Sequence, residues 1–254
     1  MAVATAEATA RAAKSEVEIS MSAKPLRRLF AIGLVALLAP ANAAAATTAI
    51  TTTTRMLCLH GYSQNGQIFR DRSGGFRKPF KKRKLDLVYA DAPFGCTAKG
   101  EDEATADLDL TRRAWWRGHS GLETYVGWTE SSEMLKRVWE HEACSGLFGF
   151  SQGAAAAAIL SADVEAPRPK FAIFVSGFVP RDTASAARLL EGVADVPSLH
   201  VFGIKDELVV PSRSRALAEL FHDATILEHE GGHTTPSSAI VREQVSQFLD
   251  SLDD

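Results

Sequence analysis

The chain has few cysteines, no surplus of positive charge and no apolar run of the length that spans a membrane. Its three cysteines are an odd number and lie far apart, which excludes a fully paired disulfide framework and the close spacing of zinc ligands. The formal net charge of -3 argues against general binding to nucleic-acid phosphates, because such binding needs a basic surplus. With 254 residues, 46% of them hydrophobic, the chain is long enough to bury one full core.

The first 50 residues differ in composition from the rest, since they are rich in Ala and Thr and poor in aromatic residues. Basic residues at positions 24–28 precede an apolar segment at 29–39 and then small residues, an order that resembles a secretory or lumenal signal. The apolar segment is too short for a stable membrane span, which needs ~20 residues. Acidic residues before it favour a disordered Ala-rich tail or a wrongly assigned start codon instead. With either interpretation, we predict that residues 1–53 lie outside a folded domain at 54–254.

From Arg55 onward, short apolar runs alternate with longer helical patterns, which predicts parallel strands joined by helical crossovers. Strands are predicted at residues 56–59, 85–89, 146–150, 171–175, 199–203 and 225–228. Helices are predicted at residues 68–80, 130–142, 152–160, 184–190, 212–221 and 237–249. The stretch 97–111 carries five acidic residues and little apolar content, so we expect an exposed loop after the second strand. The fold class is therefore α/β, with a mostly parallel central sheet flanked by helices.

Near the middle of the chain, an apolar run ends in Gly149-Phe150-Ser151-Gln152-Gly153 and passes directly into a second apolar segment. This order predicts a strand, a sharp turn and a helix with a serine at the turn, which is the nucleophile elbow of the α/β-hydrolase fold. A side chain on such a turn projects clear of the sheet and leaves its hydroxyl open to substrate. The two glycines let the helix pass close to the strand on either side of the strained serine. We therefore predict a compact α/β hydrolase with Ser151 as its nucleophile.

A serine hydroxyl needs a base and a buried carboxylate that orients the base, and in this fold the chain order is Ser, Asp or Glu, then His. Asp206 follows the predicted strand at 199–203, at the edge where ligand sites of parallel sheets lie. His233 follows the next strand in a glycine-containing loop that can carry the imidazole toward Ser151. We therefore predict a triad of Ser151, Asp206 and His233. Glu207 is the nearest alternative carboxylate, but it lies one residue further into the turn.

The negative oxygen of a tetrahedral intermediate needs hydrogen-bond donors, and the loss of one donor typically costs about 2.7 to 4 kcal/mol. One predicted donor is the backbone N–H of Gln152, which follows the nucleophile at a helix N-terminus. The other is the backbone N–H of Tyr62, in the loop after the first strand, where Gly61 lets the backbone bend inward. We interpret His60, beside this loop, as a structural residue at the strand end rather than a second base.

The segment His229-Glu230-Gly231-Gly232-His233 fits the H-E-x-x-H signature of zinc metalloproteases. That chemistry needs both imidazoles on one face of a helix. Here the two residues between them are glycines, each of which costs ~1 kcal/mol in a helix interior, and the preceding residues 224–227 are typical of a strand. We therefore expect no metal site and no cofactor.

A group of aromatic residues surrounds the acidic stretch at 97–111, and its members can line a pocket for an apolar acyl chain or pack the face of the sheet. They are Phe94, Trp115, Trp116, Tyr125 and Trp128. Trp115 is the residue that we predict to line the substrate pocket. The others are assigned to the core or to the rim of the pocket.

Four motifs occur in order along the chain: Leu59-His60-Gly61-Tyr62 with Gln64-Asn65-Gly66, then Gly149 to Ala154, then Asp206 to Pro211, and Gly231-Gly232-His233. From Arg55 to about Leu249 the chain resembles the FSH family of serine hydrolases, and the ordered set of motifs is more specific than any one of them. The resemblance implies a compact hydrolase without a large lid domain, acting as an esterase or thioesterase on apolar acyl groups. It implies the same roles for Ser151, Asp206 and His233, and a location in the cytoplasm or nucleus.

The leading hypothesis is a metal-free hydrolase of carboxylic esters or thioesters that forms an acyl intermediate on Ser151. Its expected partner is a small-molecule acyl substrate, and no nucleic acid. Two alternatives stay open, namely a serine peptidase and a non-catalytic hydrolase-fold protein that keeps the pocket to bind a ligand. The location has an alternative too, because a functional signal at residues 24–46 would direct the chain to an organelle lumen or out of the cell.

Overall fold

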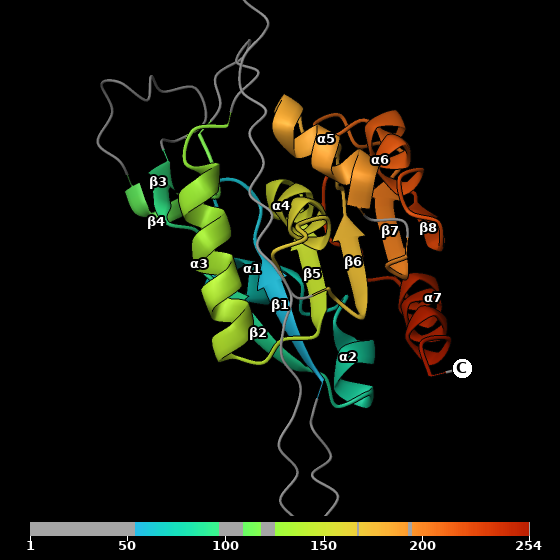
Figure 1. The fold of residues 1–254 in the computed structure, drawn as a ribbon. Coiled ribbons are helices and arrows are strands. Elements are labelled where there is room, and N and C mark those ends of the chain that lie inside the picture. The colour runs from blue at the N-terminus through green and yellow to red at the C-terminus, as the bar shows by residue number, and fades with distance from the viewer. Residues whose placement is uncertain (1–53, 97–108, 118–124, 167, 193–194, 254) are drawn as a thin grey trace, which may run out of the picture. The chain divides into compact units, whose positions relative to one another are not determined.

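The computed structural model describes residues 54–96, 109–117, 125–166, 168–192 and 195–253. Within these ranges, six parallel strands form one sheet in the order β2-β1-β5-β6-β7-β8 (Figure 1). Their bounds are Arg55–Leu59 for β1, Asp86–Ala90 for β2, Gly146–Phe150 for β5, Phe171–Val175 for β6, Ser198–Gly203 for β7 and Ala224–His229 for β8. The short strands β3 (Phe94–Cys96) and β4 (Asp109–Ala114) form a separate antiparallel pair. The parallel sheet confirms the predicted α/β class.

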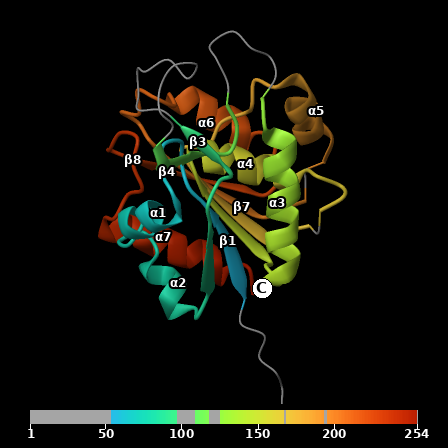
Figure 2. The ribbon, with the colours of Figure 1, turned by 90° about the vertical axis from the view of Figure 1, so that its left-hand side faces the viewer.

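Helices cover both faces of the sheet (Figure 1 and Figure 2). They are α1 (Gly66–Arg72), α2 (Lys78–Lys82), α3 (Trp128–His141), α4 (Gln152–Ser161), α5 (Thr183–Gly192), α6 (Pro211–Ala218) and α7 (Ala239–Asp250). A phenylalanine-rich core lies between the sheet and α1, α2 and α7, and it includes Phe69, Phe80 and Val241. A second core lies between the sheet and the other four helices, and it includes Trp139 and Leu217. The alternation of strands and helices therefore produces three layers.

Helix α4 is the most deeply buried helix among those described, and all ten of its residues are buried. The five alanines at positions 154–158 have no exposed surface. Because their side chains are small, the helix can lie close to the central strands. This packing fixes the start of α4 relative to the end of β5.

Each of the six predicted parallel strands is present, with bounds within one residue of the prediction. The single helix predicted at 68–80 is wrong, because α1 and α2 are separate helices with Gly74 and Gly75 between them. A Cβ at Gly75 would lie 2.5 Å from Ser237 Cβ, so the chain passes that segment too closely for a side chain. The glycine pair therefore interrupts the helix where the fold needs a close approach.

The loop predicted at 97–111 is corrected in part, because residues 109–111 belong to β4. Residues 97–108 lie outside the described residues. Strand β4 is tied to the segment after β1, since the Arg113 N–H donates to Gln64 O at 2.8 Å and the Ser63 N–H donates to Arg113 O at 3.0 Å. The polar sequence of β4 does not indicate a strand. The residues that pair with it lie far away along the chain, so a local pattern does not show the pairing.

The N-terminal segment predicted at 1–53, including the signal-like residues 24–46, lies outside the described residues. In the part of the chain that the structure describes, no helix combines the length and apolar character needed to cross a membrane.

Candidate active site

Ser151 lies on the sharp turn between β5 and α4, and its φ of 54° and ψ of -118° are strained for a residue with a side chain. A Cβ at Gly149 would lie 2.5 Å from Ala154 Cα. A Cβ at Gly153 would lie 2.2 Å from the carbonyl oxygen of Leu59. Both positions therefore require glycine, because only a residue without a side chain lets α4 approach the strands this closely. The turn places Ser151 where the carboxyl ends of the parallel strands lie. We call this side of the sheet its carboxyl edge and the opposite side its amino edge.

The structure brings His233 and Asp206 to Ser151, as the sequence order predicts. His233 Nε2 lies 3.0 Å from Ser151 Oγ, and His233 Nδ1 lies 2.7 Å from Asp206 Oδ2. With the Nδ1–H donated to the carboxylate, Nε2 is free to accept the serine proton. This is the arrangement that a nucleophile, its base and the group that orients the base require.

Asp206 is 2% exposed, and both of its carboxylate oxygens accept hydrogen bonds. Oδ1 accepts the N–H of Leu208 at 3.0 Å and the N–H of Val209 at 2.9 Å, while Oδ2 faces His233. Burial raises the pKa of Asp206, but the Val209 N–H and His233 together outweigh burial, so the pKa lies below its ordinary value. Asp206 is therefore ionised at neutral pH. Glu207, the alternative carboxylate, is exposed.

The loop that carries His233 packs against the end of β7. The Lys205 N–H donates to the carbonyl oxygen of Gly231 at 3.1 Å, and a Cβ at Gly203 would lie 2.2 Å from that same oxygen. The His233 ring also packs on Phe150, with 4.9 Å between ring centroids. The close approach at Gly203 therefore fixes the loop so that the imidazole faces the elbow.

The two predicted oxyanion donors lie in separate segments of the chain, one at the start of α4 and the other after β1. Gln152 is the first residue of α4, so its N–H has no acceptor within the helix, and the helix dipole adds positive potential there. Tyr62 lies in the turn after β1, which is closed by the Gln64 N–H donating to Gly61 O at 3.2 Å. The Gly61 N–H in turn donates to Gln64 Oε1 at 3.3 Å. Tyr62 and Ser151 line the same cavity.

Trp115 does not line this cavity, contrary to its predicted role. It has no exposed surface, and its indole N–H donates to the carbonyl oxygen of His60 at 2.8 Å. Its backbone N–H donates to the side chain of the first α4 residue at 2.9 Å. Trp115 therefore supports the end of β1 and the start of α4 from within the core. Among its neighbours, Trp116 stacks on Tyr125 and meets Trp128 edge-on.

His60 has no exposed surface, and its ring is held by two backbone groups. Its Nδ1 lies 2.8 Å from Gly61 O, and its Nε2 lies 3.0 Å from the Ala92 N. The neutral ring fits both partners when Nδ1 donates and Nε2 accepts. Burial lowers the pKa of His60 to about 4. These contacts agree with the interpretation of His60 as a structural residue.

A cavity of about 890 Å³ opens at Ser151 and His233. Its apolar wall consists of Phe69, Phe150, Phe178, Leu208 and Val209, and three arginines also line it, namely Arg72, Arg112 and Arg213. None of these residues was predicted from the sequence to line the pocket. The apolar run Leu208-Val209-Val210, which follows Glu207, was a usable signal for Leu208 and Val209, whereas the arginines follow no recognisable pattern.

The segment that fits the zinc signature is a strand followed by a loop. His229 is the last residue of β8, and its Nδ1 accepts the Gly231 N–H at 3.1 Å. Both ring nitrogens of His233 face Asp206 and Ser151. Among the described residues, no group of three His, Cys, Asp or Glu side chains is arranged to hold a metal ion.

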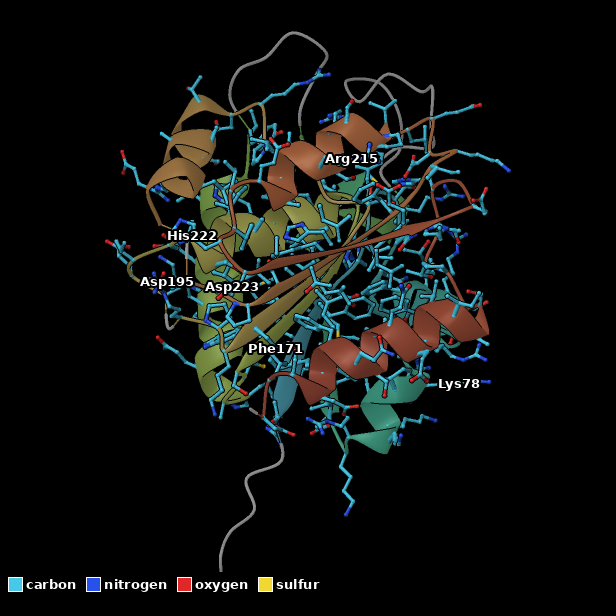
Figure 3. All side chains as sticks on the ribbon, turned by 90° about the vertical axis from the view of Figure 1, so that its right-hand side faces the viewer. Lys78, Phe171, Asp195, Arg215, His222 and Asp223 are labelled. Carbon is cyan, nitrogen blue, oxygen red and sulfur yellow. The ribbon has the colours of Figure 1, made fainter. Side chains whose placement is uncertain are left out.

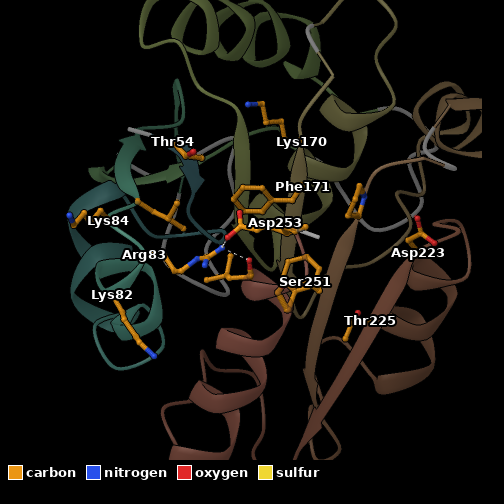
Figure 4. Close-up of a pocket in the computed structure, with 15 residues that line it drawn as sticks. Thr54, Lys82, Arg83, Lys84, Lys170, Phe171, Asp223, Thr225, Ser251 and Asp253 are labelled. Carbon is orange, nitrogen blue, oxygen red and sulfur yellow. Dashed lines mark hydrogen bonds and ion pairs between the residues drawn. The ribbon is translucent and has the colours of Figure 1, made fainter. Parts of the chain in front are cut away.

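A second cavity, of about 860 Å³, lies at the amino edge of the sheet (Figure 4). Phe171 and Thr225, near the starts of β6 and β8, line it together with Arg83. Arg83 donates to Leu249 O at 2.7 Å and forms ion pairs with Asp250 and Asp253. None of the described residues that line it is a histidine or a cysteine, so they offer no base of the kind found beside Ser151.

Comparison with known proteins gives consistent results. The profile of the family described as "Serine hydrolase (FSH1)" matches residues 50–245. An esterase of Aedes aegypti is 34% identical over 209 residues, which cover 77% of this chain and 74% of that protein. Esterase OVCA2 of Danio rerio is 35% identical over 219 residues, which cover 77% of this chain and 96% of that protein.

Solved structures with the same fold include esterase PE8, with a TM-score of 0.59 and 21% identity over 79% of this chain and 93% of that chain. Acyl-protein thioesterase 2 of Zea mays gives a TM-score of 0.57 and 18% identity over 79% of this chain and 94% of that chain. At these identities the likeness establishes the α/β-hydrolase fold alone. Because the family profile covers most of the chain and several curated relatives exceed 30% identity, the chain belongs to the FSH1 family of serine hydrolases.

Proposed function

We propose that this protein hydrolyses carboxylic esters or thioesters of apolar acyl groups through an acyl intermediate on Ser151. The observation that carries the proposal is the hydrogen-bonded series from Ser151 Oγ through His233 to Asp206, with distances of 3.0 Å and 2.7 Å, at the mouth of a cavity. Membership of a serine hydrolase family, with curated relatives named esterases, supports ester hydrolysis as the reaction class.

In the proposed first step, His233 Nε2 takes the proton of Ser151 as Oγ bonds to the carbonyl carbon of the substrate. Asp206 orients the imidazole and stabilises its positive charge. The backbone N–H groups of Gln152 and Tyr62 donate to the carbonyl oxygen as it becomes negative. His233 then gives its proton to the departing alcohol or thiol, which leaves an acyl ester on Ser151. A water molecule, deprotonated by His233, hydrolyses that ester and restores the serine.

The apolar lining of the cavity supports an apolar acyl group as the part of the substrate that the cavity binds. Its wall of three phenylalanines, a leucine and a valine excludes water from an alkyl chain. Its volume of about 890 Å³ falls within the range of roughly 300–1,000 Å³ that is usual for small-molecule sites.

A panel of p-nitrophenyl esters with increasing acyl length, assayed on the full chain, tests the proposal. We expect kcat/KM to rise with acyl length until the cavity is filled, and Ser151→Ala to lower turnover by about 10³-fold or more. Cleavage of peptides without cleavage of esters would support a serine peptidase instead. Ligand-induced melting shifts without any turnover would support the non-catalytic alternative. Loss of activity in a chelator, restored by zinc, would overturn the metal-free mechanism.

We also propose that residues 54–254 carry the activity without residues 1–53. A chain that starts at Thr54 should then keep kcat/KM within about twofold of the full chain. The family resemblance favours the cytoplasm or nucleus, which a fluorescent fusion of the full chain can test. A lumenal or secreted fusion that becomes cytoplasmic when residues 24–46 are deleted would support the signal instead.

A further inference from the structure

Three arginines line the cavity at Ser151, although the whole chain has a net charge of -3. Arg72 at the end of α1, Arg112 in β4 and Arg213 in α6 all line it, and no described residue of its lining is Asp or Glu. Helix and strand segments far apart in the sequence therefore bring positive charge to one cavity. Such a cavity attracts anions and raises their local concentration.

Arg213 lies against an aromatic ring of the cavity. It is half-buried, and its guanidinium carbon lies 4.5 Å from the centre of the Phe178 ring, which also lines the cavity. In the part of the chain that the structure describes, no carboxylate forms an ion pair with Arg213. Burial and the nearby Arg181 guanidinium both lower the pKa of Arg213, so its charge is not balanced locally. Partial burial makes the charge of Arg213 more costly than that of an exposed arginine, and a bound anion would lower this cost.

The same helix shows how an arginine is neutralised when the fold itself supplies the partner. Arg215 lies two residues further along α6 (Figure 3), forms an ion pair with Glu228, and lies 5.4 Å from the centre of the Phe202 ring. Residues two apart on a helix face different sides. Helix α6 therefore pairs Arg215 within the fold and leaves Arg213 for the cavity.

We propose that the cavity binds substrates with an anionic group, a carboxylate or a phosphate, and that Arg213 binds this group while the reacting carbonyl lies at Ser151. Phe178 covers the face of the guanidinium, so its N–H groups can donate to two oxygens of the anion at once. The substrate class is thus an ester or thioester with an apolar acyl chain and a negative charge. The identity of the bond that is cleaved rests on the proposed function.

The first test compares mono-p-nitrophenyl adipate, which ends in a carboxylate, with p-nitrophenyl hexanoate, which does not. The readout is the ratio of kcat/KM for the anionic ester to kcat/KM for the neutral ester. We expect a ratio of about ten or more, because a charge-assisted hydrogen bond has that effect, and a decrease in the ratio as salt is added. Arg213→Gln should bring the ratio close to one, and Arg213→Lys should give an intermediate ratio because it keeps the charge and loses the fork.

Arg215→Gln is the matched control, because it removes an arginine from the same helix without touching the cavity. Its ratio should equal that of the unmodified chain. A ratio near one in the unmodified chain, or a ratio that Arg213→Gln leaves unchanged, would overturn the proposal. A lower melting temperature in Arg213→Gln with an unchanged ratio would assign the stacking on Phe178 a structural role only.

A second pair of substrates locates the anion. Hexanoyl-coenzyme A carries phosphates on its leaving group, and the hexanoyl thioester of N-acetylcysteamine does not. If Arg213→Gln loses the preference for the anionic substrate in the thioester pair alone, the anion that Arg213 binds is on the leaving group. If the variant loses this preference in the adipate pair alone, the anion is on the acyl chain. Either result supports the proposal, and a preference that persists in Arg213→Gln for both pairs contradicts it.

Binding measurements separate failure of this inference from failure of the proposed function. In the Ser151→Ala chain, calorimetry should detect monomethyl adipate more strongly than dimethyl adipate, and Arg213→Gln in that background should remove the difference. Binding of this kind in a protein inactive on every ester would refute the hydrolase and keep the anion site. Serine-dependent turnover with neither binding difference nor substrate preference would refute the anion site alone.

Discussion

The two edges of the central sheet carry cavities of similar size and different chemistry, about 890 Å³ at the carboxyl edge and about 860 Å³ at the amino edge. At the amino edge, Arg83 forms ion pairs with Asp250 and with Asp253, and Figure 4 draws the pair with Asp253. At the carboxyl edge, Arg213 has no such partner among the described residues, and Ser151 faces an imidazole. Volume therefore does not distinguish the candidate active site from the second cavity. What differs is the imidazole beside Ser151, because no described residue that lines the amino-edge cavity is a histidine.

The largest effect on activity is expected when the carboxylate beside His233 is removed. Asp206→Asn should lower kcat by about 10⁴-fold, because an amide favours the wrong tautomer of the imidazole. Steady-state kinetics on a p-nitrophenyl ester measure the loss, with melting temperature as the check on folding. The neighbouring Glu207→Gln is the control and should keep full activity, because Glu207 is exposed. Equal losses in the two variants would contradict the assignment.

Alanine substitutions at one glycine on each edge compare how rigid the two edges are. In Gly153→Ala at the carboxyl edge, the new Cβ would lie 2.2 Å from a backbone oxygen of Leu59, which cannot move aside. In Gly146→Ala at the amino edge, it would lie 2.7 Å from the ring of Phe171, which borders a cavity and can shift. We expect urea unfolding to show a loss of about 3 kcal/mol for the first and about 1 kcal/mol for the second. The reverse order would show that the elbow is not sterically constrained.

Acid should destabilise the protein through one buried histidine at the carboxyl edge and one in β7. Burial lowers the pKa of His60 to about 4 and that of His200 to about 3. The unfolded chain therefore takes up protons first, so stability is complete above about pH 7. It falls as the pH drops from about 6.5 toward those values, by up to roughly 3 kcal/mol for His60 and by more for His200.

Urea unfolding at several pH values measures this loss. His200→Phe should make the free energy of unfolding less dependent on pH, because it removes the titrating ring of β7. A phenylalanine fits this position because the His200 ring packs between Phe174 and Phe221. An unchanged slope in that variant would mean that His200 does not contribute.

The smallest expected effect sharpens the contrast between the two edges. Arg83→Gln removes two partly exposed ion pairs, so the free energy of unfolding should fall by roughly 0.5 to 1 kcal/mol while kcat/KM stays unchanged. Arg213→Gln should show the opposite pattern, with altered substrate preference as its main effect. A change in ester hydrolysis in Arg83→Gln would indicate that the amino-edge cavity has a part in the reaction.

The sequence was most informative where one residue type has few alternatives. Apolar runs predicted all six parallel strands, and the two glycines beside Ser151 marked a turn that no other residue fits. The order of Ser151, Asp206 and His233 predicted the residues that the structure places within hydrogen-bond distance. These features depend on local pattern and on topology, which the sequence carries directly.

Features that depend on distant partners were not predictable. Strand β4 is polar and is recognisable only from its pairing with β3 and with the segment after β1. Trp115 was expected in the pocket, but its indole is bonded to the end of β1 inside the core. Arg213 and Arg215 look alike in the sequence, and only the packing of α6 shows that one faces Glu228 and the other the cavity.

Covalent labelling is the direct test of whether Ser151 is a nucleophile that His233 activates. The full chain is treated with a fluorophosphonate probe, and the modified peptide is identified by mass spectrometry. We expect one adduct on Ser151, slow labelling in His233→Ala and no labelling in Ser151→Ala, because the imidazole makes this hydroxyl the reactive one. An adduct on another residue, with Ser151 unmodified, would contradict this role of Ser151.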